Sequence, residues 1–215
     1  MRIFILLLVP IVFLLSFNSF GQAPTTADAW INEIHYDNNG GDVNEGVEII
    51  IADVSTYPLS EFSVVLYNGS DNETYGSKIS YGTPTSQSTK NGFTIAWKLE
   101  SGIQNGSPDG LALVHNDGTT ETVVQFLSYE GTITAANGPA NGQTSVDIGV
   151  QESNSSTGES ESLQLSGTGI QYTYFTWQDP ATRTNGAINN NQILNLKTQV
   201  QFTSATGSVA ENGGS

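Results

Sequence analysis

Short runs in which apolar and polar residues alternate recur from Trp30 onward, and clusters of Gly, Asn, Asp and Pro separate them. Alternation with a period of two is typical of a strand with one buried face, and Val47, Ile49 and Ile51 form such a face. No window of helical length has apolar residues at a helical spacing. The pattern therefore predicts strands at 30–36, 46–52, 63–67, 92–97, 110–114, 122–128, 144–150, 162–165 and 172–176.

Turn sequences such as Asn68-Gly69 and Asp109-Gly110 lie between these runs, and they supply the positive φ angles that tight turns need. Many short strands joined by such turns favour a sandwich over alternating strands and helices. We therefore predict an all-β sandwich.

Two later segments differ in composition. Residues 131–161 are rich in Gly, Asn, Ser and Thr, which predicts long surface loops around the short strand at 144–150. Residues 189–198 have the polar composition of a linker. The alternating pattern returns at 200–203 and predicts a strand without a partner, so we expect the sequence to be part of a longer protein.

The first residues have the pattern of a signal peptide. Arg2 precedes the apolar run 3–15, and the small residues Ser19 and Gly21 stand at the −3 and −1 positions of a cleavage site after Gly21. The alternative is a membrane anchor, but the run is shorter than the ~20 apolar residues that a spanning helix needs, and Pro10 interrupts it. We expect cleavage, export to the outside or surface of a bacterial cell, and no membrane span in the mature chain.

Composition narrows the possible partners. Six Lys and Arg stand against 21 Asp and Glu, so the formal net charge is −15. Such a chain repels the phosphate backbone of nucleic acids, so we expect no direct nucleic-acid binding. The negative charge favours the binding of cations instead. Cysteine is absent, so stability must come from packing, bound ions or neighbouring domains.

Several stretches resemble bacterial lamin-tail domains, in which an INEI strand, an acidic Gly-rich loop and a VEI strand recur. The stretches are WINEIHYD at 30–37, GGD at 40–42, EGVEI at 45–49, VVLYNG at 64–69, GIQNGSPDGLAL at 102–113, VQFLSYEG at 124–131, DIG at 147–149, SLQL at 162–165 and FTW at 175–177. The resemblance implies an immunoglobulin-like β-sandwich. It also implies a place at the N-terminus of a large exported protein, with either a nuclease domain or adhesive repeats downstream.

The stretch VQFTSATGSVAENGG at 200–214 looks like the first strand of a Calx-beta domain, a calcium-binding β-sandwich repeat. This resemblance favours the adhesive context, and it makes Glu211 a candidate for a calcium site in that second domain. The expected organisation is a signal peptide at 1–21, a linker at 22–29, a lamin-tail-like sandwich at 30–188, a linker at 189–198 and the truncated start of a second sandwich at 199–215.

The loop between the first two predicted strands carries closely spaced oxygen side chains and two glycines. Asp37, Asp42 and Glu45 are the candidate ligands for Ca²⁺, which takes six to eight oxygen ligands, and Glu48 is a further candidate. The spacing is not that of an EF-hand. The alternative is a solvated hairpin loop that tolerates acidic residues.

Candidate catalytic residues are few. His35 stands at a strand end beside Asp37 and His115 precedes a turn, so we interpret both as unrelated turn histidines. Neither belongs to the ligand spacing of a metal hydrolase or to a serine hydrolase motif. We expect a non-catalytic binding or spacer module, with an unidentified protein or polysaccharide ligand, in a larger exported bacterial protein. The alternatives are the accessory domain of a secreted endonuclease/exonuclease/phosphatase-type nuclease, and a hydrolase that uses paired carboxylates.

Overall fold

Two β-sheets form the domain in a computed structural model that describes residues 22–106 and 108–196. The seven-stranded sheet contains β1 (Ala29–His35), β2 (Gly46–Ile51), β5 (Ser86–Lys90), β6 (Phe93–Leu99), β10 (Glu161–Gly169), β11 (Phe175–Thr182) and β12 (Gln192–Leu194). The five-stranded sheet contains β3 (Phe62–Asn68), β4 (Glu73–Ser80), β7 (Asp109–Asn116), β8 (Glu121–Tyr129) and β9 (Val146–Asp147). The described helices are the 3₁₀ turns η1 (Leu59–Glu61) and η2 (Tyr172–Tyr174), and neither is long and apolar enough to cross a membrane.

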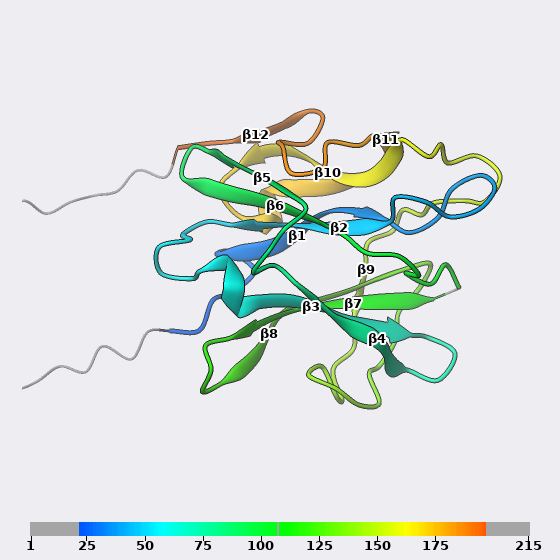
Figure 1. Ribbon diagram of the computed structural model, residues 1–215, viewed down its shortest axis with the longest axis horizontal. Coiled ribbons are helices and arrows are strands. Elements are labelled where there is room, and N and C mark those ends of the chain that lie inside the picture. The colour runs from blue at the N-terminus through cyan, green and yellow to red at the C-terminus, as the bar shows by residue number, and fades with distance from the viewer. Residues whose placement is uncertain (1–21, 107, 197–215) are drawn as a thin grey trace, which may run out of the picture.

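The sheets pack face to face as a β-sandwich (Figure 1). The larger sheet has the order β11-β10-β1-β2-β6-β5, with β12 beside β10, and the smaller has the order β4-β3-β7-β8-β9. Their inner faces share one apolar core, in which Ile31 and Ile49 belong to the larger sheet and Leu66 and Leu111 to the smaller. Removal of this apolar surface from water is the main force that holds the layers together.

The outer face of the smaller sheet is also apolar. Val65 and Tyr67 alternate along β3 with core residues and belong to a second buried cluster. Ile133 and Ala140 cover this cluster from the segment between β8 and β9, which runs beneath the smaller sheet in Figure 1. The Gly- and Asn-rich segment 131–145 therefore packs a few buried residues on the sheet, while most of its residues are exposed, as predicted for a surface loop.

The outer face of the larger sheet is covered by the segment from Arg183 to Asn195, which lies on the side away from the smaller sheet (Figure 1). Trp30 is fully buried, with its ring stacked on Phe175 and edge-on to Phe93, at centroid distances of 5.9 Å in both cases. The central strands β1, β2 and β7 are thus buried on both faces.

The fold confirms the all-β sandwich. Seven of the predicted strands correspond to β1, β2, β3, β6, β7, β8 and β10. The prediction at 144–150 is reduced to the two residues of β9, and the prediction at 172–176 begins in η2 before β11. Strands β4 and β5 were missed because their residues are mostly polar and exposed, so they show little apolar alternation. The predicted signal peptide, the strand predicted at 200–203 and the candidate ligand Glu211 lie outside the described residues.

The linker predicted at 189–198 needs correction, because its first part belongs to the domain. Gln192–Leu194 forms β12, which pairs in parallel with β10 at Gly167–Gly169. Asn189 is only 3% exposed, and its side chain donates hydrogen bonds to the carbonyl oxygens of Asn32 and Leu165. Polar composition indicated a linker, but these polar groups are satisfied inside the fold.

Replacing Leu194 with alanine tests this correction. Leu194 is 1% exposed in the core, so Leu194→Ala should lower the free energy of unfolding by about 2–4 kcal/mol in urea titrations. Leu196 is 73% exposed, and Leu196→Ala is the matched control, with an expected change within about 0.5 kcal/mol. If both variants change the free energy of unfolding by equally small amounts, residues 189–194 do not contribute to the fold and the linker prediction stands.

Candidate functional site

The two ends of the sandwich differ in what they carry. The first described residues and β12 lie at one end, on the left of Figure 1, and the loop between β1 and β2 lies at the other. The loop between β1 and β2 contains the calcium ligands predicted from the sequence. Two further loops contact it: Asn39 donates its N–H to the carbonyl of Thr157, and Glu100 donates its N–H to the carbonyl of Glu45. We call this the acidic end, formed by residues 36–45, 99–106 and 152–160.

Asp37, Asp42 and Asn105 converge at the acidic end. The Nδ2 atom of Asn105 lies 3.4 Å from Oδ2 of Asp42, and the Asn38 N–H donates to Oδ1 of Asp42 over 3.3 Å. Burial raises the pKa of Asp37, a hydrogen bond from Asn105 lowers it, and the neighbouring Asp42 carboxyl raises it again, so the net shift is upward. Asp42 itself is exposed, whereas Asp37 is 4% exposed.

Glu45 follows in the same loop and is 5% exposed. Its Oε2 accepts the Gly102 N–H over 2.8 Å, which holds the loop after β6 against the loop after β1. Burial raises the pKa of Glu45, and repulsion from Asp42 adds to this. The sequence thus predicted correctly that these three carboxyls lie in one loop, but it did not indicate that two of them are buried.

Within the described chain, no three side chains of His, Cys, Asp or Glu are placed to hold a metal ion together. The further candidate, Glu48, points elsewhere: its Oε1 accepts from Asn32 over 2.8 Å and its Oε2 accepts the Gly186 N–H over 2.5 Å. Gly186 has φ +89°, and a Cβ there would lie 2.6 Å from Ser86 Oγ, so glycine is required for this approach. Glu48 therefore holds the outer layer onto the larger sheet.

Glu33 has the same role as Glu48. Its Oε1 accepts from the hydroxyl of Ser162 and the N–H of Thr184, and its Oε2 accepts from the Thr184 hydroxyl and the Asn185 N–H, all within 3.2 Å. The two glutamates face each other across paired strands β1 and β2. Burial raises the pKa of Glu48 well above its ordinary value, and the charge of Glu33 raises it further.

A third buried carboxylate, Glu152, binds the start of the β1–β2 loop at the acidic end. One of its oxygens accepts the N–H groups of Tyr36 and Asp37, over 2.6 and 2.9 Å, and the other lies 2.8 Å from Nδ1 of His35. The side chains of His35 and Glu152 are both fully buried. The sequence did not point to Glu152, because it lies 117 residues from His35 in a segment predicted to be surface loop.

His35 faces an acceptor on each side, since its Nε2 lies 3.1 Å from the carbonyl oxygen of Val43. A doubly protonated ring satisfies both contacts, whereas a neutral ring leaves one acceptor without a donor. Burial lowers the pKa of His35, but the hydrogen bond and the charge of Glu152 outweigh it, and the net shift is upward. The histidine interpreted as a turn residue is thus the buried anchor of the acidic loop.

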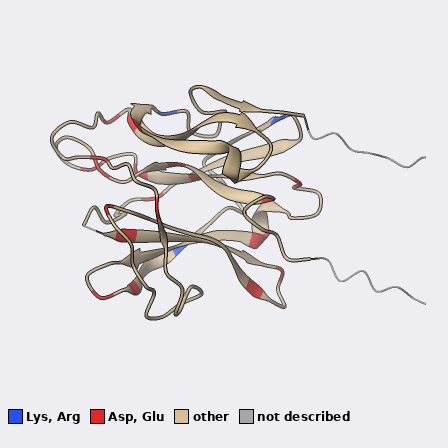
Figure 2. Ribbon diagram, turned by 180° about the vertical axis from the view of Figure 1, so that it is seen from behind, with Lys and Arg blue, Asp and Glu red and all other residues tan. Residues whose placement is uncertain are grey.

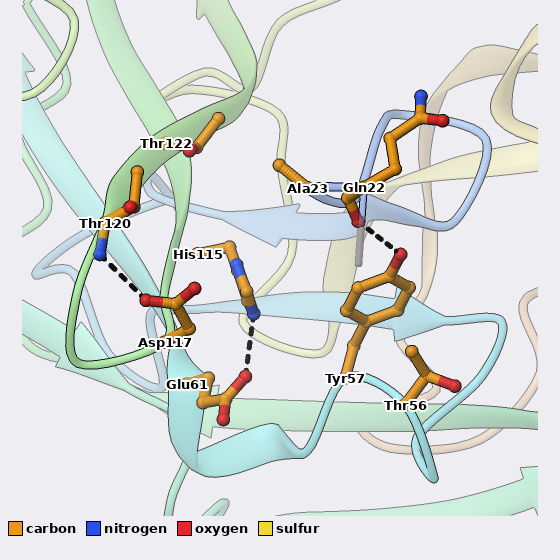
Figure 3. A pocket seen from close by; sticks show the side chains of 9 residues that line it. All are labelled: Gln22, Ala23, Thr56, Tyr57, Glu61, His115, Asp117, Thr120 and Thr122. Carbon is orange, nitrogen blue, oxygen red and sulfur yellow. Dashed lines mark hydrogen bonds and ion pairs between the residues drawn. The ribbon is translucent and has the colours of Figure 1, made fainter. Parts of the chain in front are cut away.

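A pocket of about 470 Å³ lies at the opposite end, beside the start of the described chain. Figure 3 shows the residues that line it: Gln22, Ala23, Thr56, Tyr57, Glu61, His115, Asp117, Thr120 and Thr122.

His115 lies 2.8 Å from Glu61 through its Nε2, and its ring packs edge-on against Tyr57 at 5.7 Å. A histidine paired with a carboxylate can activate a hydroxyl nucleophile when the hydroxyl reaches the ring. In the described part of this pocket, however, no hydroxyl group hydrogen-bonds to His115. The pair fastens η1 to β7. Tyr57 holds the first described residue by donating to the carbonyl of Gln22 over 2.8 Å.

Acidic residues are spread over both sheets and the loops, and basic residues are few (Figure 2). One described lysine, Lys78, forms an ion pair with Glu121 on the smaller sheet. Comparisons of the chain with protein-family models, with curated proteins and with solved structures found no match. Function must therefore be argued from the site itself.

Glu48 gives a pH prediction. Because its folded-state pKa is raised, its contribution to stability falls as the pH rises from the unfolded pKa of about 4.5 and is fully lost above the folded pKa. The free energy of unfolding should therefore drop between pH 5 and pH 8, and Glu48→Gln should drop less over the same range. Urea titrations at both pH values measure this difference.

The matched control is Glu73→Gln, which removes the same charge from an exposed position on β4. Its pH dependence should equal that of the wild type. If Glu48→Gln also keeps the full drop, Glu48 does not carry a proton in the folded state at these pH values, and the argument from its burial fails.

Proposed function

We propose that this domain is a non-catalytic binding and spacer module that presents its acidic end to a protein or polysaccharide ligand. The arrangement of the two ends supports this proposal best. The described chain starts and finishes at one end of the sandwich, and the acidic end lies opposite (Figure 1). A module attached at one end to a larger protein would project the other end outward.

Because chain segments pack over the faces of both sheets, we expect a ligand to bind at an end of the sandwich. Segment 131–145 packs over the smaller sheet and segment 183–195 over the larger one, so the flat faces are occupied by the chain itself. At the acidic end, a hollow of about 240 Å³ is lined by Asn44, Glu45, Leu99, Glu100 and Ser101. Leu99 is 47% exposed beside Glu100, so the hollow offers both apolar and negatively charged surface.

The buried carboxylates support a structural rather than a chemical role for the acidic groups. Glu33, Glu48 and Glu152 each accept backbone N–H groups from a segment distant in sequence. In a chain without cysteine, such contacts fasten loops where a small exported domain would otherwise use disulfides. A rigid, cysteine-free module suits a bacterial surface or extracellular protein.

The sequence resemblances give this proposal its context. We propose that the sandwich is of the immunoglobulin-like type and belongs with bacterial lamin-tail domains, behind a cleaved signal peptide. The Calx-beta-like stretch from residue 199 favours a parent protein with adhesive repeats. The nuclease context remains the alternative reading of the resemblance.

A binding screen with the purified full chain tests the proposal. The chain is immobilised through a C-terminal tag, and interferometry records binding of bacterial and matrix polysaccharides and of basic and acidic proteins. Ligands with basic groups should bind, because the negative potential of the acidic end favours them. Each bound ligand is recovered and analysed for cleavage, and we expect it to be intact.

Two matched double variants locate the binding surface. Glu100→Gln with Glu159→Gln removes two charges at the acidic end, and it should slow association and weaken its dependence on salt. Asp117→Asn with Glu121→Gln removes one charge from the β7–β8 connection and one from the start of β8, near the first described residues, and it should leave binding unchanged. Cleaved ligand, or equal loss of binding in both variants, would contradict the proposal.

A further inference from the structure

We propose that the acidic end binds one Ca²⁺ ion between the side chains of Asp37, Asp42 and Asn105. This inference shares one assumption with the proposed function, namely that the acidic end is the end that binds ligands. Cation binding itself is measured without any other ligand, so the two proposals can fail separately.

Buried oxygen atoms without donors are the first observation. Oδ1 of Asp37 and Oε1 of Glu45 are inaccessible to solvent and have no hydrogen-bond partner among the described residues. Both residues are at least 95% buried. A buried carboxylate oxygen that lacks a donor costs free energy, so natural sites of this kind usually hold a proton, a water or an ion.

The approach of two carboxyls is the second observation. Oδ1 of Asp42 accepts the N–H of Asn38, the residue next to Asp37, over 3.3 Å, and the Asp42 charge is near enough to raise the pKa of Asp37. Asn105 places its Nδ2 3.4 Å from Oδ2 of Asp42, so a half-turn of its amide would bring the amide oxygen to this position. Glu45 adds negative charge near Asp42. Like charges at this separation are stabilised when a proton or a cation lies between them. At neutral pH in a calcium-containing medium, a divalent cation is the stronger competitor.

The donor set decides which cation fits. Carboxylate and amide oxygens are hard ligands, which suit Ca²⁺ and exclude sites built for zinc or copper. The nearest histidine, His35, has both ring nitrogens engaged by Glu152 and Val43, so it offers no nitrogen ligand. The loop contains Gly41 and Gly40, the latter at φ +98°, and its carbonyl oxygens together with water would complete six to eight ligands.

The expected affinity is modest. Only two carboxylates converge directly, in agreement with the finding that no three acidic, His or Cys side chains in the described chain form a metal group. Neutral Asn105 and the nearby charge of Glu45 add to the two carboxylates. Affinity follows the number of charged ligands and the rigidity of the site, which places this one with extracellular modules at a Kd of about 10⁻⁴–10⁻³ M.

Calorimetry and thermal melting of the full chain test the inference, with CaCl₂ as the probe and NaCl at matched ionic strength as the reference. The chain should bind one Ca²⁺. At a calcium concentration ten times Kd, the folding equilibrium constant should rise about elevenfold over the reference by mass action. MgCl₂ should have a smaller effect, because Mg²⁺ demands a more regular geometry and loses its water reluctantly.

Asp42→Asn is the first variant, because Asp42 is exposed and its loss should not prevent folding. It should weaken calcium binding about tenfold or more by removing a charged ligand. Asp179→Asn removes the same charge from an exposed position on β11 and should keep the full calcium response. Asn105→Ala is a second variant at an exposed position that tests the neutral ligand.

Terbium luminescence gives a direct reading of the site. Tb³⁺ replaces Ca²⁺ at oxygen sites and emits when a tyrosine lies nearby, and Tyr75 contacts Gln104 next to Asn105. Emission that Ca²⁺ displaces in the wild type and in Asp179→Asn, but that is weak in Asp42→Asn, supports the site. An equal calcium response in all variants would mean charge screening only. That result, or no binding at 10 mM Ca²⁺, overturns the inference.

Discussion

Buried carboxylates that accept backbone N–H groups are the interaction on which the rest of this structure depends. Glu33 and Glu48 hold the chain after β11 onto the larger sheet, and Glu152 holds the start of the acidic loop. Each of these carboxyl oxygens satisfies a buried backbone donor, and such hydrogen bonds are stronger in a medium of low dielectric constant. Each bond ties together segments that lie far apart in the sequence.

Burying these carboxyl groups costs electrostatic free energy, and this cost bears on the proposed function. Burial raises the pKa of Glu48, Glu152 and Asp37, so the folded chain holds negative charge reluctantly. His35 offsets part of the cost at the acidic end, because its pKa is raised beside Glu152. At the outer edge of that end, Asp42 forms no ion pair with a described residue, and a cation or a basic ligand would lower the repulsion between Asp42 and Asp37.

The candidate site could be predicted from sequence only where it is local. Asp37, Asp42 and Glu45 lie within nine residues, so their shared loop followed from the pattern around two glycines. Glu48 follows only three residues later but belongs to a different environment, because strand residues alternate between the two faces of a sheet. The contributions of Asn105 and Glu152 could not be predicted, since they reach the site from loops more than 60 residues away.

The sequence alone determined the class of fold, because the period-2 alternation and the turn residues are local properties that identify strands directly. It also determined the strong negative charge and the absence of disulfides. Only the tertiary structure decided which polar residues are buried. Asn189 and Gln192 have the composition of a linker, yet they lie in the outer layer, since their hydrogen-bond partners come from distant strands. Local pattern records the propensity of a segment, whereas burial of a polar group depends on partners that only the folded chain supplies.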